Sequence, residues 1–303
     1  MTRAVWASIS SPGGRAENQD QAGDREVDGA RIWVVADGLG GHAGGARAST
    51  AAVSAILDRF RQEPGADAKR LETEFFAAQE AILRVQQEDP SIGGCRTTAV
   101  VLLEENGRAL WGHVGDTRLY QFQDGQVAHQ TLDHSVPQAL ASAGEIEPEG
   151  IRTHPDRNRL LRALGGDEDP TPTLPGSVLS QLGDREVFLL CTDGFWEYIT
   201  EADMEETLAK ASDPEAWLAE MERRLLERAS GTYDNYTATA VFFGGDPSRA
   251  SSPARVSRTR SSKPAQRADA DDADEEGAST ALLVAVALVT AVIGSVLWWV
   301  VLG

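Results

Sequence analysis

The chain has few cysteines and no apolar stretch at its start. Its 303 residues include only two cysteines, Cys95 and Cys191. Cys191 closes the apolar run 187–190, which is typical of a buried strand, so a disulfide framework is not expected. The first ten residues, MTRAVWASIS, lack the apolar core that a secretory signal peptide needs. The sequence therefore predicts that the globular part stays in the reducing cytoplasm.

Basic residues are also scarce. The chain has 28 Lys and Arg against 47 Asp and Glu, which gives a formal net charge of −19 at pH 7. Residues 246–278 are nearly balanced in charge, so the acidic excess lies in residues 1–245. An acidic surface repels nucleic acid phosphates and favours divalent cations and basic protein segments, although it also serves solubility. Nucleic acid is therefore not an expected partner.

The first 245 residues alternate strand-like and helix-like segments. In 46–60 and 70–88, apolar residues recur at spacings of three and four, which predicts amphipathic helices on a sheet. Several predicted strands are close neighbours along the chain, which favours hairpins and an antiparallel sheet over a doubly wound parallel one. The predicted strands are 3–8, 31–36, 98–103, 109–114, 117–123, 187–191 and 236–243.

The composition changes after residue 245. Ser, Pro, Arg and Ala dominate first, followed by an acidic run, which predicts a disordered linker over 246–277. Residues 278–302 carry no charge and contain the pair Trp298-Trp299. Because about 20 apolar residues cross the hydrocarbon layer of a bilayer, this segment predicts a transmembrane helix. The simplest topology is a single-pass C-terminal anchor that leaves residues 1–277 in the cytoplasm.

Two strand-like runs end in the same dipeptide, Asp37-Gly38 and Asp193-Gly194. A carboxylate at a strand end is rigidly aimed, and the following glycine lets a backbone carbonyl approach the same point, which suits a hard cation. Each dipeptide taken alone is more typical of an ordinary turn. Asp234, directly before the last predicted strand, adds another carboxylate. Together these residues indicate a site for divalent cations.

Two further segments carry charged side chains that suit such a site. In the loop GGRAENQD after the first predicted strand, Arg15 stands five residues before Asp20. A guanidinium can hold phosphate through two parallel hydrogen bonds, while the carboxylate serves the metal ions. Asp116 lies at a predicted hairpin turn between two strands.

Eight motifs follow one another along the chain, among them VVADGLGGHAGG around Asp37 and LLCTDGFWEYIT around Asp193. In their order they resemble the PPM family, the metal-dependent protein phosphatases of type 2C, and especially its bacterial members. The resemblance covers residues 3–243 and implies an α+β fold for the catalytic domain, residues 1–245. The implied fold is a central antiparallel β-sandwich flanked by helices, in four α-β-β-α layers. The motifs are GGRAENQD, VVADGLGGHAGG, CRTTAVVLL, HVGDTRLY, TLDHSVPQALASAGEI, HPDRNRLLRALGG, LLCTDGFWEYIT and DNYTATAVFF.

The resemblance implies a site for two Mn²⁺ or Mg²⁺ ions, with a third and weaker ion beside them. Asp37 would bridge the two ions, and Arg15 would bind the substrate phosphate. A water shared by the ions would attack phosphorus, so no protein nucleophile is needed. This agrees with the absence of a Cys-x5-Arg signature at either cysteine. The other implied metal ligands are the Gly38 carbonyl, Asp193, Asp234, Asp20 acting partly through water, and Asp116, which would hold the third ion with Asp193.

The sequence departs from the family pattern at three places. Gln19 stands where many members have Glu, so weaker or water-mediated metal binding is expected there. Leu39 stands where eukaryotic members often have a His that is proposed as a general acid. Cys95-Arg96 replaces the commoner Gly before the pair of threonines, and the sequence offers no functional reason for it.

The resemblance implies an enzyme that hydrolyses phosphoserine and phosphothreonine in proteins. A Ser/Thr protein kinase would be its functional counterpart, in bacterial signalling at the membrane. Two other classes remain open: a catalytically weak pseudophosphatase that binds phosphoproteins, and a membrane-tethered sensor module. Pseudophosphatases usually lose metal-binding aspartates, whereas this sequence keeps all of them, which favours the enzyme.

Overall fold

The computed structural model of the chain describes most of the first 244 residues and one short strand after them. The predicted transmembrane segment, 278–302, lies outside the described residues. Among the residues that the structure describes, no helix is both long and apolar enough to cross a membrane. The first compact unit of the chain extends from Met1 to Ser262. The described residues are 3–41, 44–174, 180–183, 186–244 and 257–259.

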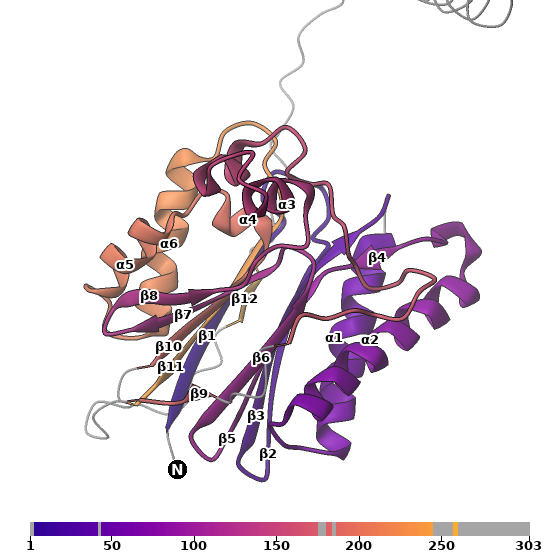
Figure 1. The fold of residues 1–303 in the computed structure, drawn as a ribbon, viewed down its shortest axis with the longest axis horizontal. Helices are drawn as coiled ribbons and strands as arrows, with labels where there is room; N and C mark the ends of the chain where they lie inside the picture. Colours follow the sequence, from indigo (N-terminus) through magenta and orange to yellow (C-terminus); the bar gives the residue numbers. More distant parts are fainter. Residues whose placement is uncertain (1–2, 42–43, 175–179, 184–185, 245–256, 260–303) are drawn as a thin grey trace, which may run out of the picture. The chain divides into compact units, whose positions relative to one another are not determined.

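Two β-sheets pack face to face, and helices cover both outer faces (Figure 1). Helices α1 (Gly44–Gln62) and α2 (Ala68–Glu88) cover one sheet. Helices α5 (Glu201–Leu208) and α6 (Pro214–Arg228) cover the other. This arrangement confirms the predicted antiparallel β-sandwich with helices on either side.

Within the described residues, each sheet has six strands. Neighbouring strands are antiparallel, with the exception of the β1–β12 pair, which is parallel. The first sheet has the order β12 (Ser257–Thr259), β1 (Ala4–Ser11), β11 (Tyr236–Phe243), β10 (Val187–Cys191), β7 (Arg118–Gln123) and β8 (Gln126–Gln130). The second has the order β2 (Asp20–Val27), β3 (Ala30–Leu39), β5 (Ala99–Glu105), β6 (Arg108–Val114) and β9 (Ser180–Gln181), and β4 (Arg96–Thr97) pairs with β3.

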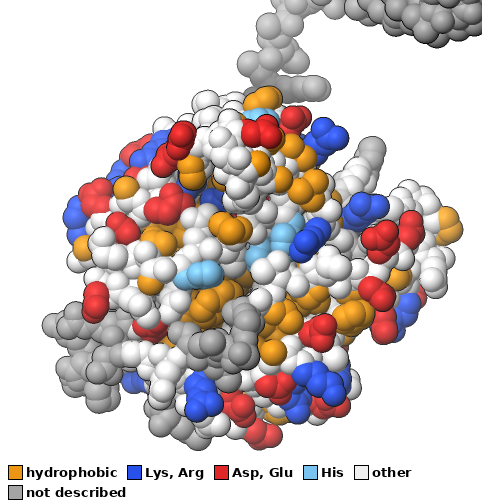
Figure 2. Space-filling model, in the orientation of Figure 1, with side chains coloured by type: hydrophobic (Ala, Val, Ile, Leu, Met, Phe, Trp, Pro, Cys, Tyr) orange, Lys and Arg blue, Asp and Glu red, His pale blue; other side chains and the backbone are white. Residues whose placement is uncertain are grey.

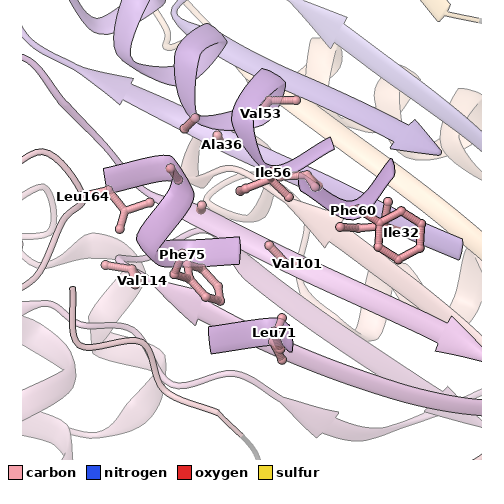
Figure 3. Packing of buried hydrophobic residues seen from close by; sticks show 14 of the residues in the cluster. Ile32, Ala36, Val53, Ile56, Phe60, Leu71, Phe75, Val101, Val114 and Leu164 are labelled. Carbon is pink, nitrogen blue, oxygen red and sulfur yellow. The ribbon is translucent and has the colours of Figure 1, made fainter. Parts of the chain in front are cut away.

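Alternation along β3 divides the core into layers. Ile32, Val34 and Ala36 belong to the cluster under α1 and α2, which Figure 3 shows from close by. Trp33 and Val35 point to the opposite face, where they join the cluster between the two sheets. Because both faces of β3 are covered, its sequence is a continuous apolar run from Ile32 to Ala36, directly before Asp37. The packed strand therefore fixes where this carboxylate lies.

Short helices and turns connect these elements near the end of the sandwich where the aspartates lie. These short elements are α3 (Val136–Ser142), α4 (Asp193–Trp196), η1 (Pro90–Ile92) and η2 (Pro148–Thr153). Ser135 caps the N-terminus of α3, because its hydroxyl accepts the backbone N–H of Gln138.

The structure adds two strands to the predicted element map. Residues 20–27, most of which no prediction covered, form β2, and Gly23 lets Leu57 of α1 pack directly on this polar strand. Within the predicted disordered linker, Ser257–Thr259 pair with Ser8–Ser10 of β1 through backbone hydrogen bonds, which need no apolar pattern. The rest of the linker lies outside the described residues.

Candidate active site

Aspartates from different strands meet at one end of the two sheets. Asp20 begins β2 and faces Asp37 near the end of β3 in the antiparallel register. Asp193 begins α4 just after β10, and Asp234 precedes β11, the neighbour of β10. Thr192 Oγ1 donates a hydrogen bond of 2.8 Å to Asp20 Oδ2 and so joins the two sheets at this end. The carboxylates that the sequence predicted as one site therefore do come together.

Two threonines, Thr97 at the end of β4 and Thr98 directly after it, hold the backbone of Asp37 through hydrogen bonds. The carbonyl of Asp37 accepts hydrogen bonds from Thr97 Oγ1 at 2.6 Å and from Thr98 N at 2.8 Å. The amide of Asp37 donates to Thr98 Oγ1 at 3.1 Å. Thr98 Oγ1 is also hydrogen-bonded to Thr117 Oγ1. These bonds fix the backbone from which the Asp37 carboxylate projects.

Gly38 and Gly45 allow β3 to meet the start of α1. A Cβ on Gly38 would overlap the Gly45 carbonyl and would lie 2.6 Å from the Gln19 carbonyl. A Cβ on Gly45 would lie 2.8 Å from the Gly38 carbonyl carbon. The approach is therefore possible only without side chains, and it fixes the Gly38 carbonyl beside Asp37. This is the backbone oxygen that the sequence predicted as a metal ligand.

Asp20 is buried with half of its carboxylate unpartnered. One oxygen, Oδ2, accepts the Thr192 hydroxyl, whereas the other, Oδ1, has no hydrogen-bond partner among the described residues. Burial raises the pKa of Asp20 to about 7, against the lowering effect of the hydrogen bond from Thr192. A buried carboxylate oxygen without a donor is costly unless a cation or a water approaches it. This oxygen therefore fits a position next to a bound metal ion.

The pKa values of Asp37 and Asp193 are also raised, by burial and by repulsion between neighbouring carboxylates. Burial raises the pKa of Asp37 well above its usual value, and repulsion by Asp193 is the next cause. Burial also raises the pKa of Asp193 well above its usual value, followed by repulsion from Asp116. Carboxylates that destabilise one another in this way are stabilised by a divalent cation between them.

Asp116 lies in the turn between β6 and β7, as predicted. The preceding Gly115 has a φ of +101°, which a residue with a side chain rarely adopts. Trp196 Nε1 donates a hydrogen bond of 2.9 Å to the Asp116 carbonyl. Burial raises the pKa of Asp116 to about 7, with repulsion from Asp133 as the next cause. The turn and the indole thus aim a buried carboxylate toward Asp193.

Arg15 pairs with one of the predicted metal ligands. Its Nη2 lies 2.9 Å from Asp234 Oδ2, and both side chains are partly exposed, at 53% and 37%. Asp234 Oδ1 accepts the backbone N–H of Asn235 at 2.8 Å. Gly13 permits the close approach of these loops, because a Cβ there would overlap the Asp234 carbonyl oxygen. Both oxygens of Asp234 are therefore engaged in hydrogen bonds.

The three departures from the family pattern have clear positions. The Gln19 carbonyl accepts Gly38 N at 3.1 Å and Ser49 Oγ at 2.6 Å, so its backbone ties β3 to α1. Leu39 pairs with Arg96 in the β3–β4 ladder. Cys95 is buried against Gly40 and Gly44, where a Cβ would lie 3.6 Å and 3.3 Å from the Cys95 Cβ. Cys95 therefore fills the space beneath the glycine-rich turn.

Several residues that organise the site were not predicted. Asn235 binds three backbone groups: it accepts Gln19 N and donates to the Pro12 and Glu17 carbonyls, which holds the Arg15 loop in place. Trp196 is buried and binds the Asp116 carbonyl through its indole nitrogen. Asp133 forms a buried ion pair with Arg118, at 2.7 Å. Long-range partners such as these leave no local pattern in the sequence.

The donor set fits a cation that keeps part of its water shell. Among the described residues, no three His, Cys, Asp or Glu side chains converge closely enough to hold a metal ion by themselves. Mg²⁺ binds typically through one or two carboxylates and several waters. The unpartnered Asp20 Oδ1, the fixed Gly38 carbonyl and the crowded carboxylates match that mode of binding. A closed cage of side chains is not required.

Comparisons with known proteins agree with this arrangement. A family model described as protein phosphatase 2C matches residues 14–232. The serine/threonine protein phosphatase PstP of Mycobacterium tuberculosis is 35% identical over 232 residues, which cover 75% of this chain and 42% of that protein. The match thus spans less than half the length of that relative.

Solved structures give the same similarity at the level of the fold. The crystal structure of the M. tuberculosis serine/threonine phosphatase PstP/Ppp has a TM-score of 0.71 and 29% identity, and the match covers 81% of this chain and all of that one. The catalytic domain of PstP in complex with two manganese ions has a TM-score of 0.69 and 28% identity, with 81% of this chain and 100% of that chain covered.

Proposed function

Because this chain belongs to the protein phosphatase 2C family, we propose that it hydrolyses phosphoserine and phosphothreonine in proteins with two Mn²⁺ or Mg²⁺ ions. The observation that carries the proposal is the crowded group of aspartates around the Asp20 Oδ1 atom, which has no partner among the described residues. The manganese ions in the related PstP structure support the choice of metal. The names of the relatives support the substrate class.

Each residue of the group has a distinct role in this proposal. When bound, such ions lower the pKa of a shared water and neutralise charge on the phosphate. The hydrogen bonds of Thr97 and Thr98 hold the Asp37 backbone in place, so its carboxylate would give the ions a fixed position relative to the substrate. The proposed ligands are Asp37 as the bridge, the Gly38 carbonyl, Asp193 and Asp234, with Asp20 acting partly through water and Asp116 at a third site.

Arg15 binds the substrate phosphate in the proposed mechanism. Its side chain is 53% exposed and lies against Asp234 at the edge of the group, so it can turn toward an incoming phosphate. A dianionic phosphate is a stronger partner for guanidinium than one carboxylate is. On binding, Arg15 would give up Asp234 Oδ2, which would free that oxygen for a cation. Substrate and metal binding would then reinforce each other.

The site of action proposed for the enzyme is the membrane. The uncharged segment 278–302 supports a single-pass anchor, with the catalytic domain in the cytoplasm. A membrane-bound Ser/Thr kinase is the proposed counterpart, because confining both enzymes to one surface raises their effective concentration.

Hydrolysis of a phosphothreonine peptide by the full chain tests the proposed function. We expect phosphate release with Mn²⁺ and with Mg²⁺, none with chelator, and at least a hundredfold loss in Asp193→Asn, which removes one charge from the metal group. Circular dichroism would check that this variant is folded. A folded wild-type chain that binds Mn²⁺ but releases no phosphate would reject the enzyme and favour a phosphoprotein-binding role.

A further inference from the structure

A hollow of about 450 Å³ lies beside α3, and none of the residues proposed to bind metal or phosphate line it. Its walls include Trp111 of β6, His129 of β8, Gln138 of α3 and Arg162. Figure 2 shows His side chains next to hydrophobic ones near the middle of this face, with Lys or Arg beside them. A hollow of this size accommodates more than one side chain of a partner.

Exposed leucines gather at the hollow. The large hydrophobic side chains exposed in the described part of the chain are Leu132 at 61%, Leu161 at 59% and Leu226 at 38%. Leu132 and Leu161 both line the hollow. Apolar side chains that are gathered on a surface and rimmed by polar groups mark a contact site, whereas single ones need no explanation. The lone Leu226 on α6 therefore provides a natural comparison.

The hollow carries a positive charge on an otherwise acidic protein. Asp133 lines it, but both oxygens of Asp133 are bound by Arg118, at 2.8 Å and 2.7 Å, so its charge is neutralised. His134 is neutral, because its Nδ1 accepts the Gly115 N–H and its pKa is lowered to about 3 by burial and then by His113. Arg162 donates to the neutral Thr171 carbonyl at 3.3 Å, and no carboxylate of the described residues pairs with it.

Hydrogen bonds link the lining of the hollow to the Asp116 turn of the candidate active site. His134 N donates to the Gly115 carbonyl at 2.9 Å, and Gly115 immediately precedes Asp116. Arg118, which Asp133 holds, stacks 3.5 Å above the Trp196 ring, and the Trp196 indole binds the Asp116 carbonyl. The hollow and the candidate site therefore share the Asp116 turn as a common support, so one substrate chain could contact both.

We propose that the hollow docks a segment of the phosphoprotein substrate that carries a leucine-like side chain next to an acidic residue. The aliphatic side chain contacts Leu132, Leu161 and Trp111, and the carboxylate pairs with Arg162. Arg162 supplies the complementary charge for the carboxylate, whereas the net −19 of the chain as a whole disfavours an acidic segment. The inference rests on the proposed function, because docking beside the site matters only if the site acts on phosphoproteins.

Two sets of peptides test the proposal on the full chain. The first is a short phosphothreonine peptide, and the second joins it to a Leu-Asp segment through a series of glycine-serine spacers. With a spacer that reaches the hollow, we expect KM to fall by about tenfold at unchanged kcat, because the second contact becomes intramolecular. Leu161→Ser should abolish the gain and leave turnover of the short peptide unchanged. Leu226→Ser is the matched control and should keep the gain.

A charge exchange separates recognition from a structural effect. Arg162→Glu should lose the gain from Leu-Asp and acquire one from a Leu-Lys segment, which a merely structural role of Arg162 would not produce. Equal KM for short and extended peptides at every spacer, with the short peptide hydrolysed, would overturn the docking site and leave the proposed function standing. If neither peptide is hydrolysed, the proposed function fails and the docking role with it. A dimer that Leu161→Ser dissociates would assign the hollow to a second copy and also overturn the proposal.

Discussion

Thr98 holds the backbone of Asp37 through its own amide and hydroxyl. The hydroxyl accepts Asp37 N and contacts Thr117, so removal of this single oxygen leaves a buried amide without its partner. The same oxygen does not reach solvent, since Thr98 is fully buried. The position of the Asp37 carboxylate therefore depends in part on the Thr98 hydroxyl group.

Thr98→Val should lower kcat by about tenfold or more and weaken the activation by Mn²⁺, because a shift of the carboxylate by a fraction of an ångström misplaces the attacking water. Steady-state kinetics over a range of Mn²⁺ concentrations measures both effects. Thr73→Val, at a partly buried position of α2 far from Asp37 in the sequence, also removes a threonine hydroxyl and should leave kinetics unchanged. Equal kinetics for Thr98→Val and wild type would contradict this role of Thr98.

Glu74 of α2 gives a pH dependence that does not involve the active site. Its side chain is 2% exposed, Oε2 has no partner among the described residues, and burial raises its pKa to about 8. A carboxyl whose pKa is higher in the folded state stabilises the fold below its unfolded pKa, near 4.5, and loses this contribution as pH rises toward 8.

Glu74→Gln should therefore be more stable than wild type at pH 8.5, by an amount on the order of 1–3 kcal/mol, and equal to it near pH 4.5. Urea unfolding at a series of pH values measures the difference. Glu72→Gln, an exposed neighbour on the same helix, should show no such trend. A Glu74→Gln variant that is equally or less stable at every pH would refute the buried neutral carboxyl.

The sequence identified the aspartates themselves but not what holds them. Asp37 and Asp193 could be predicted because each comes after an apolar run and precedes a glycine, which is a local pattern. The partner of Asp20, Thr192, is 172 residues away, and nothing near either residue indicates the contact. The ion pair of Arg15 and Asp234 likewise joins loops from opposite ends of the domain. Such contacts follow only from the packing of the two sheets.

At the scale of elements, the junction of β3 with α1 determines the shape of the site. Gly38→Ala would place a methyl group against the Gly45 carbonyl and push α1 away from the strand end. We expect a loss of stability of about 1–3 kcal/mol and a loss of most of the activity. Thermal unfolding and turnover of a phosphopeptide measure the two effects.

Gly41→Ala is the matched control for the junction, because a Cβ on Gly41 meets nothing within 4 Å. Its stability and turnover should equal those of wild type. If Gly38→Ala behaved like Gly41→Ala, the close approach of β3 and α1 would not be needed for the site.

Elements whose apolar residues recur at a regular spacing could be predicted from the sequence. Elements held mainly by backbone hydrogen bonds to a neighbouring strand, or by other elements packed over them, could not. Helices α1 and α2 match the predicted segments because their apolar stripes face the sheet. Helices α5 and α6 went unpredicted. α5 is only eight residues long and offers too short a pattern. α6 buries Trp217, Leu218, Met221 and Leu225 at helical spacing, so its apolar period was present in the sequence. Strand β2 is polar along most of its length and exists through its ladder with β3.

At the scale of the whole chain, the sandwich brings carboxylates from both sheets to one end, and the C-terminal segment is proposed to hold that domain at a membrane. Deletion of residues 278–303 should move the protein from the membrane fraction to the soluble fraction with turnover unchanged, because the aspartates belong to the compact unit Met1–Ser262. Cell fractionation and phosphopeptide assays measure both outcomes. A truncated chain that stays with the membranes would contradict the anchor.

The most direct test of the two-metal site is calorimetric titration of the full chain with Mn²⁺, compared with Asp37→Asn and Asp28→Asn. Asp28 lies in the turn at the opposite end of β2 and β3 and has a φ of +52°, which Asn tolerates well. We predict two ions bound by wild type and by Asp28→Asn, as in the related PstP structure, and a loss of tight binding in Asp37→Asn. Equal Mn²⁺ binding by all three proteins would contradict the central role of Asp37.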